Sequence, residues 1–184
     1  YNTIYLSVKD RLWSKFSYQF SHELCHHIID SNFYITNDKY GWFEETLCEL
    51  ASIYSIDSMS QTWQTEPPYP NWKDYSSSLK DYVNEIMGRT EYVISTPFNE
   101  WLEENLNELY KDRYKRTENA IIALRLLPLF KNDTKLWETI QFLKFVNVTE
   151  SMDFKSFLES WKKSVPNKLR KKIILIESTL LNNH

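Results

Sequence analysis

The chain has 184 residues, 42% of them hydrophobic and 26% charged, a balance typical of a soluble globular domain with a substantial core. Its net charge of −3 gives no reason to expect the basic face of a nucleic-acid-binding protein, and no apolar run is long enough to span a membrane. Only two glycines occur beside 16% aromatic residues, which favours a mainly helical fold.

A single strand is predicted at the start of the chain. Apolar and polar residues alternate over residues 3–8, so one face of an extended segment is apolar. A strand needs partners, which we expect in residues 32–36 or 91–95, or before Tyr1. This pattern predicts a small amino-terminal sheet remnant in an α+β fold that is otherwise mainly α.

Helices are predicted for most of the remaining chain. The first two cover residues 14–30 and 42–59, and the prolines of residues 66–72 then exclude regular helix. The aromatic residues that flank this linker either cap a core or form a wall of a substrate cleft. Further helical patterns follow at 74–88, 98–112, 114–130, 134–146, 153–164 and 166–182. We expect one catalytic domain, with a metal-binding core in residues 1–65 and a helical bundle in residues 66–184.

The first long helix contains the motif His22-Glu23-Leu24-Cys25-His26, of the form H-E-x-x-H. Residues four apart share one helix face, so both imidazoles can reach the same ion. Glu23 is offset by about a quarter turn, which suits a base that reaches a water molecule without being a ligand. The alternative is an amphipathic helix with incidental histidines.

A third ligand is predicted in the second long helix. Glu45 follows His26 after eighteen intervening residues, and a zinc site with two histidines needs one more protein ligand and an open position. Glu49 lies one turn later and is placed to hydrogen-bond a ligand histidine, with Asp30 as a weaker candidate. Ile56 shares the sector of both glutamates, which indicates that this face is turned inward and not toward solvent.

These residues resemble the signature of the gluzincin metallopeptidases, in which a glutamate ligand follows H-E-x-x-H. The spacing and the run Trp42-Phe43-Glu44-Glu45 are similar to the aminopeptidase and leukotriene-hydrolase branch, although its G-x-M-E-N motif is absent before His22. The resemblance implies a zincin-like core that holds Zn²⁺ on His22, His26 and Glu45 and hydrolyses peptide or protein substrates.

In that family Glu23 would be the general base, and a tyrosine would stabilise the oxyanion. Tyr114 is the candidate for this tyrosine, and Tyr110 is a weaker one. Two alternatives stay open: a non-proteolytic binding or scaffold module that retains its zinc, and a zinc hydrolase with other substrates.

Cys25 and Cys48 are too few for a disulfide scaffold, so we expect buried thiols, with a bond as the alternative in an oxidising compartment. No signal peptide is visible, which weakly favours the cytoplasm, but the chain starts without methionine and the compartment stays open, as does the oligomeric state.

Overall fold

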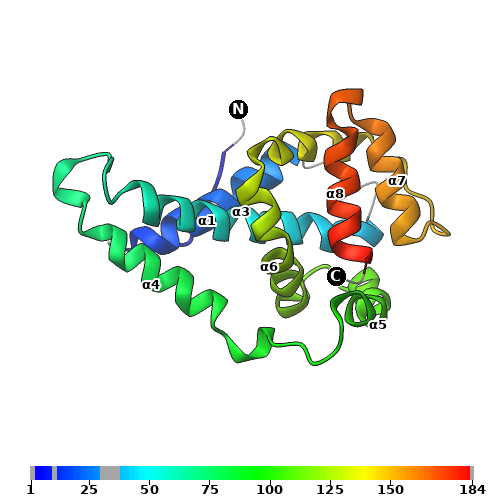
Figure 1. Ribbon diagram of the computed structural model, residues 1–184, viewed down its shortest axis with the longest axis horizontal. Coiled ribbons are helices and arrows are strands. Elements are labelled where there is room, and N and C mark those ends of the chain that lie inside the picture. The colour runs from blue at the N-terminus through cyan, green and yellow to red at the C-terminus, as the bar shows by residue number, and fades with distance from the viewer. Residues whose placement is uncertain (1–2, 10–11, 30–37, 183–184) are drawn as a thin grey trace.

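The computed structural model describes residues 3–9, 12–29 and 38–182, and within them the fold is mainly α, as predicted. The helical segments follow the predicted pattern within a few residues (Figure 1). They are α1 (Trp13–Ile29), η1 (Asp38–Tyr40), α3 (Gly41–Thr62), η2 (Pro70–Trp72), α4 (Tyr75–Met87), η3 (Thr90–Tyr92), α5 (Phe98–Lys111), α6 (Arg116–Asn132), η4 (Thr134–Phe145), α7 (Phe154–Ser164), η5 (Asn167–Leu169) and α8 (Arg170–Leu181). None of these is long and apolar enough to cross a membrane.

The predicted amino-terminal strand is not formed. Residues 3–9 are irregular, and the backbone N–H of Ser7 donates to Oε1 of Gln19 at 3.0 Å rather than to another strand. An isolated strand leaves its backbone groups without a ladder, and the described residues contain no second strand to supply one. Residues 91–95 instead contain the end of η3, and residues 32–36 lie outside the described part of the chain. The described residues therefore provide no sheet remnant.

Helix α3 is the central element of the fold. It is buried on nearly all sides over most of its length, and α1, α4 and α6 each pack against it (Figure 1). The face predicted from Ile56 to be turned inward is buried at Ile56 and at Glu45, which is 9% exposed, whereas Glu49 on the same face is partly exposed. The adjacent Glu44 is also fully buried. Burying two adjacent glutamates requires cationic or hydrogen-bonding partners, so this face of α3 is a candidate for a functional site.

An aromatic cluster fixes the amino-terminal end of α3, just before these glutamates. The ring of Tyr40 stacks on Phe157 of α7 at 4.1 Å between centroids, and its hydroxyl donates to the carbonyl of Met152 at 2.7 Å. Trp42 and Phe43 pack against Phe154 of the same helix. The carboxyl-terminal helices thus anchor the first turn of α3 in one position.

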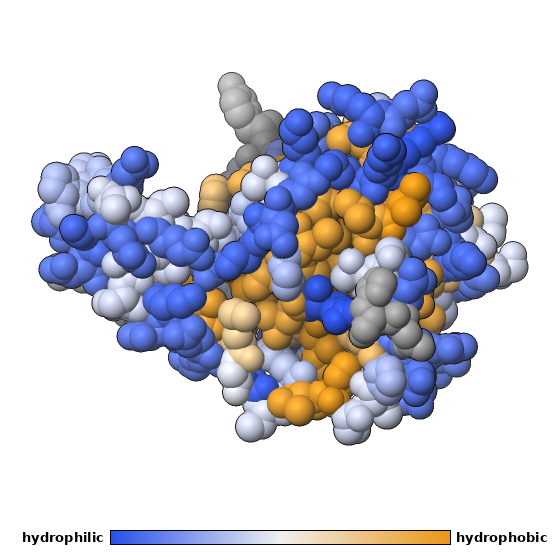
Figure 2. Space-filling model, in the orientation of Figure 1, coloured by the Kyte–Doolittle hydropathy of each residue, from blue (hydrophilic) through white to orange (hydrophobic). Residues whose placement is uncertain are grey.

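The proline-containing linker forms the exposed turn between α3 and α4. Trp72 of this linker packs against Trp13, Trp63 and Tyr69 with ring centroids 5.0–5.8 Å apart. These aromatic residues pack on one another and do not line the main cavity described below. In Figure 2 this end of the molecule, at the left, is mostly hydrophilic, whereas apolar side chains gather near the middle of the viewed face.

Candidate metal centre

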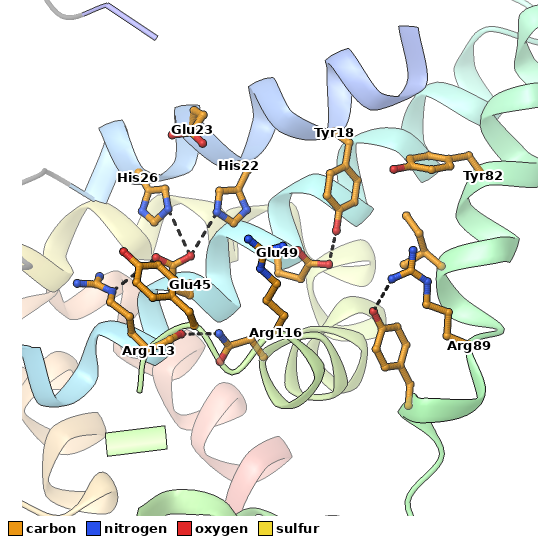
Figure 3. Close-up of a pocket in the computed structure, with 14 residues that line it drawn as sticks. Tyr18, His22, Glu23, His26, Glu45, Glu49, Tyr82, Arg89, Arg113 and Arg116 are labelled. Carbon is orange, nitrogen blue, oxygen red and sulfur yellow. Dashed lines mark hydrogen bonds and ion pairs between the residues drawn. The ribbon is translucent and has the colours of Figure 1, made fainter. Parts of the chain in front are cut away.

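Three side chains from α1 and α3 converge on one point. Nε2 of His22 lies 3.4 Å from Oε2 of Glu45, and Nε2 of His26 lies 3.6 Å from the same oxygen (Figure 3). The two imidazoles are one turn apart on α1, with ring centroids 4.9 Å apart. The sequence therefore identified residues that the fold brings together from two helices.

These separations suit a tetrahedral metal ion. Bonds of about 2.0–2.1 Å in tetrahedral zinc sites place the ligand atoms roughly 3.3 Å from one another. Both nitrogen–oxygen distances lie within a few tenths of an ångström of that value. Two imidazole nitrogens and a carboxylate oxygen also form a donor set that zinc accepts, so these residues fit the ion.

Cys48 is another donor near the two histidines. The Sγ atom of Cys48 and one nitrogen each from His22 and His26 all lie within 4.8 Å of one another, so this group could also hold a metal ion. Burial and the neighbouring Cys25 raise the pKa of the Cys48 thiol well above its usual range, and both cysteines are free thiols. A thiol that binds a metal ion loses its proton as it binds, so the comparison of Cys48 with Glu45 depends on geometry.

Glu45 is better suited than Cys48 to be the third ligand. Burial opposes ionisation of its carboxyl, but hydrogen bonds and charges from His22 and His26 lower its pKa to about 2. Glu45 also lines the main cavity together with both histidines, whereas Cys48 does not. A metal ion on Glu45 would therefore face open space, as a fourth ligand requires.

Glu44 holds the ring of His26 from the other side. Its Oε1 lies 2.8 Å from Nδ1 of His26, and the carboxylate is fully buried. An Nδ1–H that donates to Glu44 leaves Nε2 with its lone pair toward Glu45. Burial lowers the pKa of His26, but its hydrogen bonds to Glu44 and Glu45 outweigh this and raise it to about 9. The two carboxylates therefore favour a positive charge at this point.

From the sequence, Glu49 was predicted to hydrogen-bond a ligand histidine. In the structure the carboxylate beside His26 is that of Glu44. Glu49 instead accepts a hydrogen bond from the hydroxyl of Tyr18. Helices α1 and α3 run antiparallel here, so one turn forward from Glu45 corresponds to one turn back from His22, where Tyr18 lies. Burial, followed by the charge of Glu49, raises the pKa of Tyr18. Asp30, the weaker candidate, lies outside the described residues.

Arg113 is a site residue that the sequence did not indicate. Its Nη2 lies 3.6 Å from Oε2 of Glu44 and its Nε lies 3.6 Å from Oε1 of Glu45, while only 13% of the side chain is exposed. Gly41 makes room for it, because a Cβ there would lie 2.8 Å from the Cζ of Arg113. The sequence offered one sign of a close approach at this point: Gly41, one of only two glycines in the chain, stands at the start of a predicted helix.

A cavity of about 690 Å³ opens beside the three converging side chains. Glu23 lines it and makes no hydrogen bond or ion pair with another residue that the structure describes. Figure 3 shows Glu23 beside α1, apart from the contacts that join the histidines to Glu45. Tyr114 also lines the cavity and is exposed, with Arg113 over its ring. Tyr110 lies outside the cavity wall and packs on Tyr40.

Comparison with known proteins adds no family to this geometry. The chain matches no family model, no curated protein and no solved structure.

Proposed function

We propose that this chain is a zinc-dependent hydrolase of peptide bonds, of the gluzincin type. The observation that carries the proposal is that Nε2 of His22 and Nε2 of His26 approach the same oxygen of Glu45, at 3.4 and 3.6 Å, on the wall of an open cavity. A metal ion held only for structure needs four protein ligands and no access to a substrate. Here the cavity leaves room for a substrate beside three ligands.

When bound, zinc supplies a Lewis acid that polarises a carbonyl group and makes a nearby water molecule more acidic. Glu23 takes a proton from that water and passes it to the leaving amine, a role that needs a carboxylate with no competing partner. Its place on the cavity wall and the absence of a hydrogen bond or ion pair to another described residue support this role. Tyr114, which lines the same cavity, donates its hydroxyl hydrogen to the developing oxyanion.

The chain's own residues also prepare the site. Glu44 holds the imidazole of His26 in one orientation, and Arg113 lies against the carboxylates of both Glu44 and Glu45. A ligand whose orientation is fixed before the metal arrives loses less conformational freedom on binding. The buried first turn of α3 thus provides a preorganised carboxylate for the metal.

The decisive experiment compares wild type with Glu23→Gln in three measurements: zinc content, turnover of a mixed peptide library, and peptide binding. Glu23→Gln should keep its zinc and its peptide binding but lose at least ~100-fold in hydrolysis, the low end for removal of a general base. Glu104→Gln on α5, a change of the same kind at an exposed position, is the matched control and should leave all three unchanged.

A binding or scaffold module predicts a different result. The zinc-loaded wild type would then cleave nothing in a broad library, and Glu23→Gln would change no measured property. That outcome would contradict the proposed peptidase activity but not the proposed metal site.

A further inference from the structure

The cavity extends well beyond the histidines. Figure 3 shows His22 and His26 toward one side of the drawn group, with Arg89 and Tyr82 at the other and Arg116 between them in this view. The ligand end comes from α1 and α3, whereas Arg89 follows α4 and Arg116 is the first residue of α6. A peptide with its scissile bond at the ligand end would extend toward these two arginines.

Neither of these arginines is paired with a carboxylate of the described residues. Arg89 donates to the hydroxyl of Tyr92 at 3.2 Å and lies over its ring, while Arg116 has no ion pair within the described part of the chain. Arg113, the third arginine of the cavity wall, is by contrast engaged with Glu44 and Glu45. A planar guanidinium binds carboxylates through two parallel hydrogen bonds, so two arginines without such a partner favour an anionic ligand group.

The cavity's carboxylates do not offer an equivalent site for a substrate's amino group. Glu45 contacts both histidines and Arg113. Glu49 accepts a hydrogen bond from the hydroxyl of Tyr18. Glu23 is the general base in the proposed mechanism. The alternative interpretation is that Arg89 and Arg116 are solvated surface cations. Against it, both line the cavity, and a hydrogen bond to Tyr92 keeps Arg89 at the cavity wall.

We infer that this cavity recognises a carboxylate of its peptide substrate through Arg116 and Arg89, and that this carboxylate is the peptide's free carboxyl terminus. The inference rests on the proposed peptidase function, because it places the scissile bond at the histidines. An acidic side chain carries the same chemical group, so the test must separate the two sources. Substrates blocked at the amino terminus should remain good ligands.

Three amino-terminally acetylated peptides of one core sequence make the test. The first ends in a free carboxylate, the second in an amide, and the third is the amide with one internal glutamine replaced by glutamate. Binding is measured on zinc-loaded Glu23→Gln by fluorescence anisotropy, and kcat/KM is measured on wild type. The free acid should bind about 10-fold or more tightly than the amide, as expected for a charge-assisted pair, and the difference should shrink at high salt.

Arg116→Gln and Arg89→Gln should each reduce the preference for the acid without changing zinc content, and Arg116→Lys should keep part of it. Arg170→Gln is the matched control, because Arg170 is an exposed arginine at the first position of α8. Equal binding of acid and amide would overturn the inference. Preference for the glutamate peptide alone would also overturn it, because the recognised carboxylate would then belong to a side chain.

Failure of the inference is distinguishable from failure of the proposed function. If the acid binds preferentially but no peptide is cleaved, the carboxylate site stands and the hydrolase proposal fails. If acid and amide are cleaved and bound equally, the hydrolase proposal stands and the recognition by Arg116 and Arg89 is wrong.

Discussion

Nδ1 of His26 lies 2.8 Å from the carboxylate of Glu44, which is fully buried in the first turn of α3. Burial raises the pKa of Glu44, while the neighbouring His26 and Arg113 act to lower it. The contact joins a proposed metal ligand on α1 to the residue next to another ligand on α3. Interactions that hold Glu44 in place therefore also help to hold α1 and α3 in their relative position.

Loss of this contact should weaken metal binding. Glu44→Gln keeps the shape of the side chain but removes the charge that orients His26 and makes it more basic, so zinc affinity should fall roughly 10- to 100-fold. Glu49→Gln is the control on the same helix, because Glu49 contacts Tyr18, and it should change affinity far less. Competition with a chelator of known affinity measures both. A larger effect of Glu49→Gln would return the role to Glu49.

The identity of the third ligand is tested by metal content. His22→Ala, His26→Ala and Glu45→Ala should each lower zinc from about one ion per chain to near zero, because each removes a donor from a set of three. Cys48→Ala should retain the metal, since the thiol is fully buried and lies off the cavity wall. Elemental analysis of the purified variants decides the matter. Loss of zinc in Cys48→Ala with retention in Glu45→Ala would make Cys48 the ligand.

Local patterns predicted the helices well, because each has an apolar face or a proline-marked boundary that the neighbouring sequence defines. The inward orientation of Glu45 was also predictable, because Ile56 shares its sector and is fully buried. The prediction of a strand was wrong, because alternation over residues 3–8 indicates an apolar face but cannot supply a pairing partner. Local pattern is therefore sufficient for helices and insufficient for sheets in this chain.

The roles of two site residues could not be predicted from the sequence. Glu44 is adjacent to the proposed ligand Glu45, and helical geometry turns adjacent side chains about 100° apart, so only the packing of α1 on α3 brings Glu44 to His26. Arg113 comes from the connection between α5 and α6, and its approach depends on how the whole bundle closes. The missed residues are those whose role arises from tertiary contacts.

Arg113 should stabilise the fold by compensating buried carboxylates. Arg113→Met leaves Glu44 buried without its nearest guanidinium, which should lower the free energy of unfolding by roughly 3 kcal/mol. In the Glu44→Gln background the same change should cost much less, because a neutral amide needs no counter-charge. Denaturant unfolding of the four proteins of this double-mutant cycle measures the coupling. Equal losses in both backgrounds would show that Arg113 acts through packing alone.

Gly41 provides an independent check on that geometry. Gly41→Ala would place a Cβ 2.8 Å from the Cζ of Arg113, so the guanidinium must move although every charge is retained. Zinc affinity should fall with this substitution if Arg113 positions Glu45. Gly88→Ala is the control: Gly88 follows α4, and its added Cβ would approach the carbonyl oxygen of Asn84 instead. An unchanged zinc affinity in Gly41→Ala would show that Arg113 does not position Glu45.

Asp57 should make the fold sensitive to acid. This carboxylate is 2% exposed on α3 and forms ion pairs with Lys80 of α4, at 3.3 Å, and with Lys131 of α6. Burial alone would raise the pKa of Asp57, but the two lysines hold it below its ordinary value. Because the folded pKa is lowered, Asp57 contributes stability above its unfolded pKa of about 3.9, and that contribution is lost as the pH falls through the folded value.

Asp57→Asn should therefore lower the free energy of unfolding at neutral pH by roughly 1–3 kcal/mol, since both lysines are partly in solvent and their charges are screened. The difference from wild type should shrink as the pH falls below about 4, because protonation removes the same charge from the wild-type protein. Urea unfolding at a series of pH values measures this. Asp81→Asn, at an exposed position on α4, should show no such convergence. A difference that stays constant down to the acid limit would contradict a role for the charge of Asp57.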